Sequence, residues 1–267
     1  MNKFTITLIF IIGISAVLFF TLFKTEDKLE LHFLDVGQAD AILIRTPQGQ
    51  NILIDGGADN KLLSEVARVL PWWERQIDYV VISHYHADHI MGLPELLNKY
   101  SVKYVLTSNH QPDDFLYQIL MESFEQHQTP VQIVEVGEKF QIDDDLYWQI
   151  LLADDYNEDY NENSVVIRLS YQNRNFLFMG DLGIPGEEKL LSIGFDLSAE
   201  VLKVGHHGSR YASSQEFLEA VQPEICIIQS GLDNKFGHPH QEAIERLEAI
   251  GCQVLDNQVL GAIHLFY

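Results

Sequence analysis

The segment from 84 to 89 constrains this chain most, because it holds four side chains of the metal-ligand type within six residues. It reads His84-Tyr85-His86-Ala87-Asp88-His89 and closely follows the apolar run 79–82. Side chains two apart on an extended chain point to the same side, so His84 and His86 can share one cation. Asp88 and His89, one bend further on, then serve a second cation. This spacing predicts a dinuclear metal site at the end of a strand, rather than a surface loop that is rich in His and Asp by chance.

Further ligand candidates follow three later apolar runs. Asp181 closes the run 176–179, where a lone carboxylate is placed to bridge two cations. His206 and His207 follow the run 201–204, and His238 comes after the run 225–229. Each of these residues alone would be an ordinary surface or turn residue. Their joint pattern with the first cluster favours one functional site at the carboxyl ends of several strands.

The first 28 residues predict a membrane anchor. Residues 4–23 are twenty consecutive uncharged residues between Lys3 and Lys24, which is long enough for a helix that crosses a bilayer. A cleaved signal peptide is the alternative, but no small-x-small cleavage site follows the apolar stretch. We therefore expect a single-pass membrane protein with residues 1–28 as the anchor and 29–267 as one extracytoplasmic domain. The domain would be secreted if the N-terminal segment is cleaved.

The net charge of −22 gives none of the basic footprint of a dedicated DNA-binding protein. Any nucleic-acid substrate must be held locally by metals and a few cations. Cys226 and Cys252 lie in or beside apolar runs, and we expect buried free thiols. The acidic turns 143–145 and 154–159 lack the Gly and terminal Glu of a calcium loop, so they predict solvated charged loops.

Apolar periodicity predicts an α/β domain. Strands are expected over 29–36, 41–45, 51–55, 79–83, 102–107, 131–136, 146–153, 164–171, 175–179, 200–204, 225–229, near 253 and over 261–266. Helices are expected over 61–70, 94–100, 113–127, 186–192, 214–221 and 241–250. Two sheets flanked by helices accommodate these elements most economically.

These motifs resemble those of the metallo-β-lactamase superfamily, whose His-x-His-x-Asp-His signature is matched by residues 84–89. The turn 55–57, Asp-Gly-Gly, resembles another motif of that superfamily. Within it the chain is similar to the extracytoplasmic hydrolase domain of ComEC-type DNA-uptake proteins, through residues 34–40, 163–164, 180–181, 202–209 and 234–239. The resemblance implies an αββα sandwich, here preceded by one transmembrane helix. It also makes Asp181 the bridging ligand and His206 the next ligand.

The chain departs from the ComEC-type pattern in three ways. The long multi-helix membrane channel is absent, so the resemblance does not extend to transport. All four ligands of the first motif are present, whereas many ComEC-like domains carry an incomplete set. The His that is expected shortly before the bridging Asp has no counterpart, and Asn163 is the nearest polar group there; His110 and His127 lie too early in the chain to replace it.

The resulting hypothesis is a phosphodiesterase or nuclease that uses two divalent cations, zinc or manganese. His84, His86 and Asp181 would bind one cation, and Asp88, His89, His206 and Asp181 the other. Cations roughly 3.5 to 4 Å apart lower the pKa of a shared water to near 7 and so supply hydroxide at neutral pH. Asp88, His207 and His238 are the expected catalytic residues. The expected substrate contacts are Lys203, Ser209, Arg210 and Lys235.

Two other functions fit the same residues. Hydrolysis of a small ester, such as a phosphorylated wall or lipid group or a lactone, needs no basic groove. A noncatalytic, membrane-anchored partner in DNA uptake would keep the metal site for stability. Hydrolysis of β-lactams ranks last, because the specific resemblance lies with the ComEC-like branch.

Overall fold

The computed structural model describes residues 5, 10, 13–14, 28–153 and 158–267. Apart from Lys28 and the four scattered positions before it, the expected anchor over 1–28 lies outside the described residues. So do residues 154–157 of the second acidic turn. Among the residues that are described, no helix combines the length and the apolar character needed to cross a membrane.

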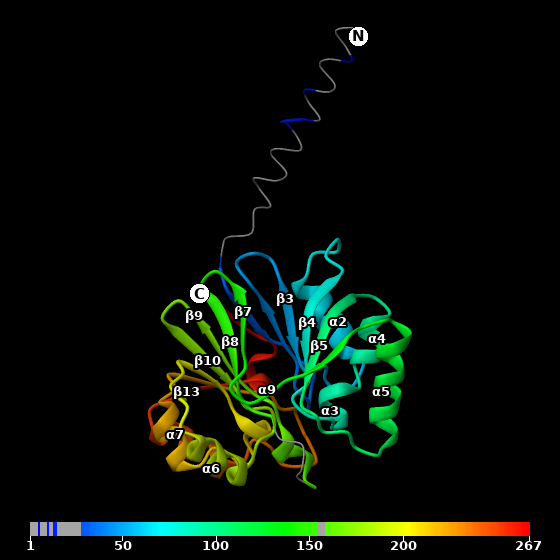
Figure 1. Ribbon diagram of the computed structural model, residues 1–267. Helices are drawn as coiled ribbons and strands as arrows, with labels where there is room; N and C mark the ends of the chain where they lie inside the picture. Colours follow the sequence, from blue (N-terminus) through cyan, green and yellow to red (C-terminus); the bar gives the residue numbers. More distant parts are fainter. Residues whose placement is uncertain (1–4, 6–9, 11–12, 15–27, 154–157) are drawn as a thin grey trace.

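The first sheet combines an antiparallel meander with four parallel strands, and β3 belongs to both parts (Figure 1). Its order is β14-β1-β2-β3-β4-β5-β6, and β3 to β6 run parallel to one another. The strands are β1 (Glu30–Phe33), β2 (Ile42–Arg45), β3 (Asn51–Ile54), β4 (Gln76–Val81), β5 (Ser101–Thr107), β6 (Val131–Ile133) and β14 (Ile263–Phe266).

The second sheet has the order β13-β12-β11-β10-β9-β8-β7, with β10 to β13 parallel. The strands are β7 (Lys139–Asp143), β8 (Leu146–Leu152), β9 (Val166–Tyr171), β10 (Arg174–Phe178), β11 (Val201–Lys203), β12 (Ile225–Ile228) and β13 (Gln253–Asp256). Strands β7 to β10 are therefore joined by antiparallel hairpins. Strands β10 to β13 are parallel, so helices connect them.

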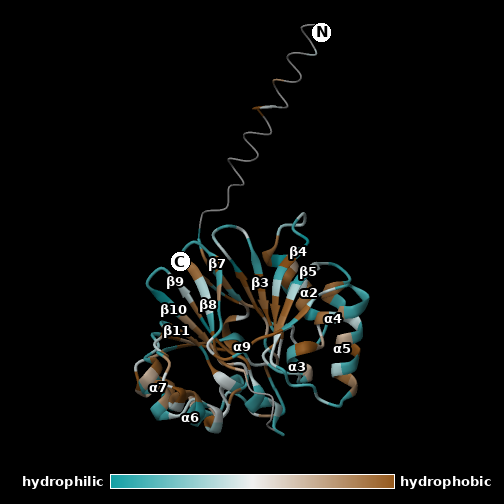
Figure 2. Ribbon diagram, in the orientation of Figure 1, coloured by the Kyte–Doolittle hydropathy of each residue, from teal (hydrophilic) through white to brown (hydrophobic). Residues whose placement is uncertain are grey.

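Helices cover the outer faces of the two sheets, which confirms the αββα layering expected from the sequence (Figure 1). Apolar residues fill the space between the sheets and the two spaces between sheet and helices, and Figure 2 shows the strands as largely hydrophobic. The helices are α2 (Lys61–Val69), α3 (Ala87–Ile90), α4 (Leu93–Leu97), α5 (Phe115–Gln126), α6 (Ile184–Ile193), α7 (Gln215–Val221), α8 (Gln241–Ala249) and α9 (Asn257–Leu260). Two 3-10 turns, η1 (Tyr160–Asn163) and η2 (Gly205–Gly208), lie near the site.

Three short elements were not expected from the sequence, namely β7, α3 and α9. Strand β7 is an edge strand in which Phe140 and Ile142 alternate with polar residues and pack against the core, so its period of two was present in the sequence and was missed. Helices α3 and α9 have four residues each, which is too short for an apolar period to appear. The strand expected over 131–136 ends at Ile133.

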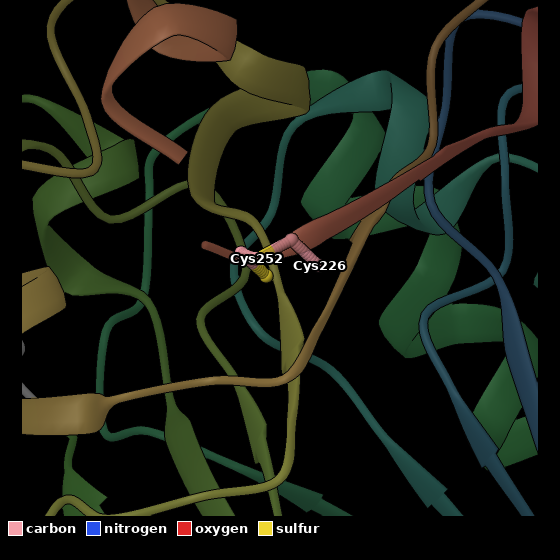
Figure 3. The surroundings of a disulfide bond; sticks show 2 residues. All are labelled: Cys226 and Cys252. Carbon is pink, nitrogen blue, oxygen red and sulfur yellow. A yellow bond between two sulfur atoms is a disulfide. The ribbon is translucent and has the colours of Figure 1, made fainter. Parts of the chain in front are cut away.

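Cys226 and Cys252 form a disulfide, so the prediction of free thiols is wrong (Figure 3). Cys226 lies in β12, and Cys252 immediately precedes β13, the parallel neighbour of β12. This pairing brings the two Cα atoms to 6.0 Å, a normal separation for a disulfide. The proximity arises from strand pairing across 26 residues, which the local sequence does not reveal.

The strand directions give the domain two functionally different ends. The parallel strands β3 and β4 and the parallel strands β10 to β12 all deliver polar loops from their carboxyl ends, and these loops meet at one end of the domain. The chain enters β1 at the other end, beside the β2–β3 hairpin (Figure 1).

Candidate metal centre

Four side chains from three segments converge at the carboxyl ends of the strands. Asp88 and His89 come from α3, Asp181 follows β10, and His207 lies in η2 after β11. One ligand atom of each lies within 4.8 Å of the others. Nε2 of His207 lies 3.3 Å from Oδ2 of Asp88 and 3.4 Å from Oδ2 of Asp181. Nε2 of His89 lies 3.4 Å from the same Asp181 oxygen, so Asp181 stands at the middle of the group.

The backbone that presents these groups is held in unusual conformations. His206 and His207 both have left-handed φ values, of 48° and 53°. Gly180, just before Asp181, has a φ of 55°, and a Cβ there would come within 2.8 Å of Ser83 and 2.9 Å of Ser164. Left-handed backbone at non-glycine residues costs about 1 to 3 kcal/mol and is concentrated at functional sites. The packing of the surrounding fold therefore stabilises an unfavourable backbone conformation that directs these side chains toward one point.

His89 is oriented by a buried carboxylate behind it. Its Nδ1 lies 2.8 Å from Oδ2 of Asp55, which also accepts a hydrogen bond from the Ser83 hydroxyl at 2.7 Å. The Ser83 amide donates to the other Asp55 oxygen at 2.8 Å. This arrangement leaves Nε2 of His89 directed at Asp181, which is how carboxylates position metal-binding imidazoles.

His207 is fixed in a similar way from the other sheet. Its Nδ1 lies 2.8 Å from the carbonyl oxygen of Gln229 and 3.2 Å from Oδ1 of Asp40. Asp40 in turn pairs with the buried ammonium of Lys203 at 2.6 Å. Both histidines of the group thus have one ring nitrogen held by the protein and the other facing the centre.

His84 and His86 lie next to this group. Nε2 of His84 and Nδ1 of His86 are 3.0 Å apart, and the rings of His84 and His89 have centroids 4.1 Å apart. His84 is buried, while His86 is half-buried and stacks on Tyr160. The structure therefore brings together the pair that the sequence predicts to share a cation.

The charges at the centre strongly perturb the titrating groups. Burial alone favours a neutral imidazole, but the Asp181 and Asp40 carboxylates outweigh it and raise the pKa of His207 to about 10. Burial also acts to lower the pKa of His89, but the charges of Asp181 and Asp55 outweigh it and raise that pKa. Burial of Asp88 is outweighed by its hydrogen bond with His207 and the charge of His89, so its pKa falls to about 2. The carboxylates here favour the presence of positive charge.

A divalent cation fits these groups on two further observations. Nε2 of His89 and Oδ1 of Asp181 are buried and lack a partner with hydrogen-bond geometry. Buried polar atoms are normally satisfied, and a cation would satisfy both. Imidazole and carboxylate donors suit zinc and manganese alike, so the donor set does not select between them.

His206, the ligand implied by the resemblance, is placed at the edge of this group. Its Nε2 lies 4.0 Å from Oδ2 of Asp181, and its side chain is 29% exposed. His207 is instead the residue whose Nε2 faces both carboxylates. The tandem His-His sequence could not show which ring turns inward, because that depends on the left-handed backbone of η2.

Three of the four expected substrate contacts lie in unsuitable places. The Lys203 side chain is 1% exposed and paired with Asp40, so its expected role in substrate contact is not supported and it instead supports His207. Arg210 is exposed and pairs with Glu242 at 2.8 Å. Ser209 is buried, and its hydroxyl oxygen accepts from the Tyr211 amide.

The remaining candidates border a hollow of about 760 Å³ in front of the centre. Asp88, Asp181, His206 and His207 line it together with Lys235 and His238. Burial, followed by the charges of His206 and His207, lowers the pKa of His238 to about 4, so this ring is neutral at pH 7. Lys235 is exposed, and its ammonium lies 4.9 Å from the ring centroid of the half-exposed Phe236.

The region of the missing third-motif histidine is also resolved. Asn163 is fully buried, while Asn161, two residues earlier, lines the hollow. The His110 ring lies 4.7 Å from that of Tyr160, which stacks on His86, whereas His127 lies away from the centre and hydrogen-bonds the Ser123 carbonyl.

Sequence reasoning gave no role to Asp40, Asp55 or Gln229. Asp55 has a left-handed φ of 59° in the Asp-Gly-Gly turn, a motif that could have pointed to it. Asp40 ends the segment 34–40, which carries part of the resemblance and could have pointed to it, whereas Gln229 acquires its role only through tertiary contact.

Comparison with known proteins agrees with this geometry. The chain is 26% identical over 281 residues to ComE operon protein 3 of Bacillus subtilis (strain 168), an alignment that covers 96% of this chain and 35% of that protein. It is 28% identical over 243 residues to competence protein ComA of Neisseria gonorrhoeae, covering 89% of this chain and 32% of that protein. The chain therefore spans about a third of the length of these curated relatives.

The fold is also present in a solved structure. The metallo-beta-lactamase fold protein YhfI from Bacillus subtilis superposes with a TM-score of 0.59 at 12% identity, covering 90% of this chain and 100% of that one. The family model described as "Metallo-beta-lactamase superfamily" matches residues 34–231, which include the first ligand cluster, Asp181 and the tandem histidines. On its sequence, its fold and the arrangement of its candidate ligands, the chain belongs to the metallo-β-lactamase superfamily.

Proposed function

We propose that this protein is a metal-dependent phosphodiesterase, and that its substrate is a nucleic acid or another phosphodiester. The observation that carries the proposal is the convergence of Asp88, His89, Asp181 and His207 beside a hollow that also receives Lys235. A divalent cation held by such donors polarises phosphoryl oxygens and lowers the pKa of water. His84 and His86, with the shared Asp181, form the second half of the proposed dinuclear site.

The residues around the hollow supply the remaining chemistry. Lys235 places a positive charge where the anionic oxygens of a phosphodiester would lie. His238 is neutral at pH 7, so its ring can accept a proton, and its N–H can donate a hydrogen bond to a leaving oxygen. Asp40 and Asp55 hold the rings of His207 and His89 and have no contact with substrate in this proposal.

The loop that carries Lys235 is held firmly by a single side chain. Oδ1 of Asn234 accepts hydrogen bonds from the amides of Phe236 at 3.1 Å and His238 at 3.0 Å, and its Nδ2 donates to the Gly231 carbonyl. The lysine, the half-exposed Phe236 ring and His238 are therefore presented together. A substrate that combines a planar ring with a phosphodiester would contact all three.

The similarity to competence proteins supports a substrate related to DNA, while the net charge of −22 favours local binding over a long basic groove. We further propose that residues 1–28 anchor the domain outside the cytoplasm. The Cys226–Cys252 disulfide supports this location, because disulfides persist mainly in oxidising compartments.

The test is hydrolysis of bis-p-nitrophenyl phosphate and of single-stranded DNA by the full chain in detergent, with zinc or manganese added. An Asp88→Ala/His89→Ala variant removes two candidate ligands, and Asp144→Ala/His127→Ala is a matched control away from the centre. We expect metal-dependent turnover that the first variant abolishes and the control retains.

The pattern of substrates separates the candidate functions. Cleavage of DNA would establish a nuclease, whereas cleavage of the small diester alone, with no competition by excess DNA, would identify a small-ester hydrolase. Absence of turnover with either metal, although metal binds and raises the melting temperature, would reject the phosphodiesterase and leave a non-phosphate ester as the substrate or a noncatalytic role in DNA uptake.

A further inference from the structure

Two adjacent tryptophans form an exposed aromatic surface between α2 and β4. Trp72 is 78% exposed and Trp73 is 48% exposed, and their rings meet edge to face with centroids 5.6 Å apart. Tryptophan normally contributes a large apolar area to cores and interfaces, and its indole N–H suits places where one side is apolar and the other wet. Such exposure indicates a contact surface.

This surface lies at the end of the domain where the chain enters it. The Asn51 side chain at the start of β3 donates to the Gln76 carbonyl at the start of β4, so the β2–β3 hairpin and the turn 70–75 lie together. Glu30 at the start of β1 pairs with Arg45 beside the same hairpin. Figure 1 shows this end of the domain, where β1 begins, remote from the carboxyl ends of the parallel strands.

The sequence before Lys28 limits how far this end can be from a membrane. Residues 4–23 are uncharged and are the expected transmembrane segment, which leaves residues 24–28 as the connection to the domain. Five residues span at most about 18 Å when fully extended. If 4–23 cross a bilayer, this end of the domain must therefore lie at or near the lipid headgroups.

The cationic side chains beside the tryptophans, Arg75 and Lys99, are complementary to lipid phosphates, although the partly exposed Glu74 lies between Trp73 and Arg75. Arg75 is exposed and lies over the Tyr100 ring at 5.2 Å, and Lys99 is also exposed. Both border a shallow hollow of about 410 Å³, and none of the described residues that line it carries a carboxylate. Two neighbouring cationic side chains around a hollow are unusual on a chain with 17 basic and 39 acidic residues.

We infer that the surface formed by Trp72, Trp73, Arg75 and Lys99 rests on a phospholipid bilayer. Tryptophan is enriched at the headgroup level of membranes, and arginine and lysine beside it reach the phosphates. In this orientation the metal centre faces away from the membrane, open to substrate. The inference uses the proposed anchor but is independent of the proposed hydrolytic activity.

Fluorescence quenching by brominated lipid tests this contact directly. The chain has three tryptophans, and the third, Trp148, is 1% exposed in the core between the sheets. The full chain is reconstituted in phosphatidylcholine vesicles with plain or brominated acyl chains. Since bromine quenches indoles that contact it, we expect the brominated lipid to remove about a third or more of the emission. A Trp72→Phe/Trp73→Phe variant, which keeps Trp148, should show the same emission in both lipids.

Two results would overturn the inference. The first is a protein that floats with the vesicles but has equal emission in plain and brominated lipid, which would place the indoles in water or against protein. The second is a chain that does not associate with the vesicles. Because no substrate is involved, either result leaves the hydrolysis assay to decide the proposed function separately.

Discussion

Oδ2 of Asp55 lies 2.8 Å from Nδ1 of His89, and this contact determines which nitrogen of the ring faces the metal centre. Both groups are buried, and Ser83 holds the carboxylate with its amide and its hydroxyl. His207 has a comparable support from Asp40 and Gln229 on the other sheet. The centre is therefore held by buried partners on both sides.

Asp55→Asn should weaken metal binding by about 10- to 100-fold, the usual effect of losing a carboxylate behind a metal-binding histidine. The amide keeps the shape of the side chain but loses its charge, and its Nδ2 stands where one carboxylate oxygen accepted a hydrogen bond. Titration with zinc, followed by calorimetry, measures the affinity. Asp144→Asn, at an exposed turn, should leave the affinity unchanged. Equal affinities for wild type and Asp55→Asn would contradict the proposed support of His89.

His207→Gln should reduce metal content more than His206→Gln does. Only Nε2 of His207 lies within 3.4 Å of both the Asp88 and Asp181 carboxylates, whereas that of His206 is 4.0 Å from Asp181. Elemental analysis after dialysis against zinc gives the number of bound ions in each variant. A greater loss in His206→Gln would instead assign the ligand that the family resemblance implies.

Lys203→Met should destabilise the fold by about 3 to 5 kcal/mol, because it leaves the Asp40 carboxylate buried without its partner. Urea unfolding measures the change in free energy. The double variant Lys203→Met/Asp40→Asn removes both charges and should recover part of the loss. If the double variant is as unstable as the sum of the two single variants, the buried pair is not coupled.

The metal-free protein should lose stability as the pH rises from about 6.5 to about 10. The pKa of His207 is about 10 in the folded state against 6.5 for an ordinary histidine, so the folded state holds a proton that the unfolded state releases across this interval. The stabilisation is complete below pH 6.5 and is lost as the pH passes the folded pKa. Urea unfolding in EDTA at pH 6 and pH 9 measures it, and His207→Gln should reduce the difference. A metal-free wild type that is more stable at pH 9 would contradict the raised pKa.

The Cys226–Cys252 disulfide should stabilise the domain by about 2 to 4 kcal/mol, since it closes a loop in the unfolded chain. Wild type should unfold at a lower urea concentration after reduction, and Cys226→Ala/Cys252→Ala should unfold at the same concentration with or without reductant. If reduction does not change the unfolding of the wild type, the two thiols are not paired in solution.

The sequence by itself determined the layers of the fold and most of the residues at its centre. Apolar runs of strand and helix length predict two sheets covered by helices, and His84, Asp88, His89 and Asp181 all lie within seven residues after such runs. This worked because burial is periodic along the chain, and because loops at the carboxyl ends of parallel strands meet at one edge. The short elements α3 and α9 could not be predicted, since four residues show no period.

Only the tertiary structure decided which groups act together. The inward turn of His207 depends on a left-handed backbone, and its support by Asp40 joins residues 167 positions apart. The Cys226–Cys252 bond depends on the pairing of β12 with β13. The burial of Lys203 depends on its ion pair with the Asp40 carboxylate from the other sheet. The period of apolar residues along the sequence indicates whether a side chain faces the core. Which residue that side chain then contacts depends on how distant strands pack together. Local sequence therefore names the candidate ligands, and packing selects their geometry.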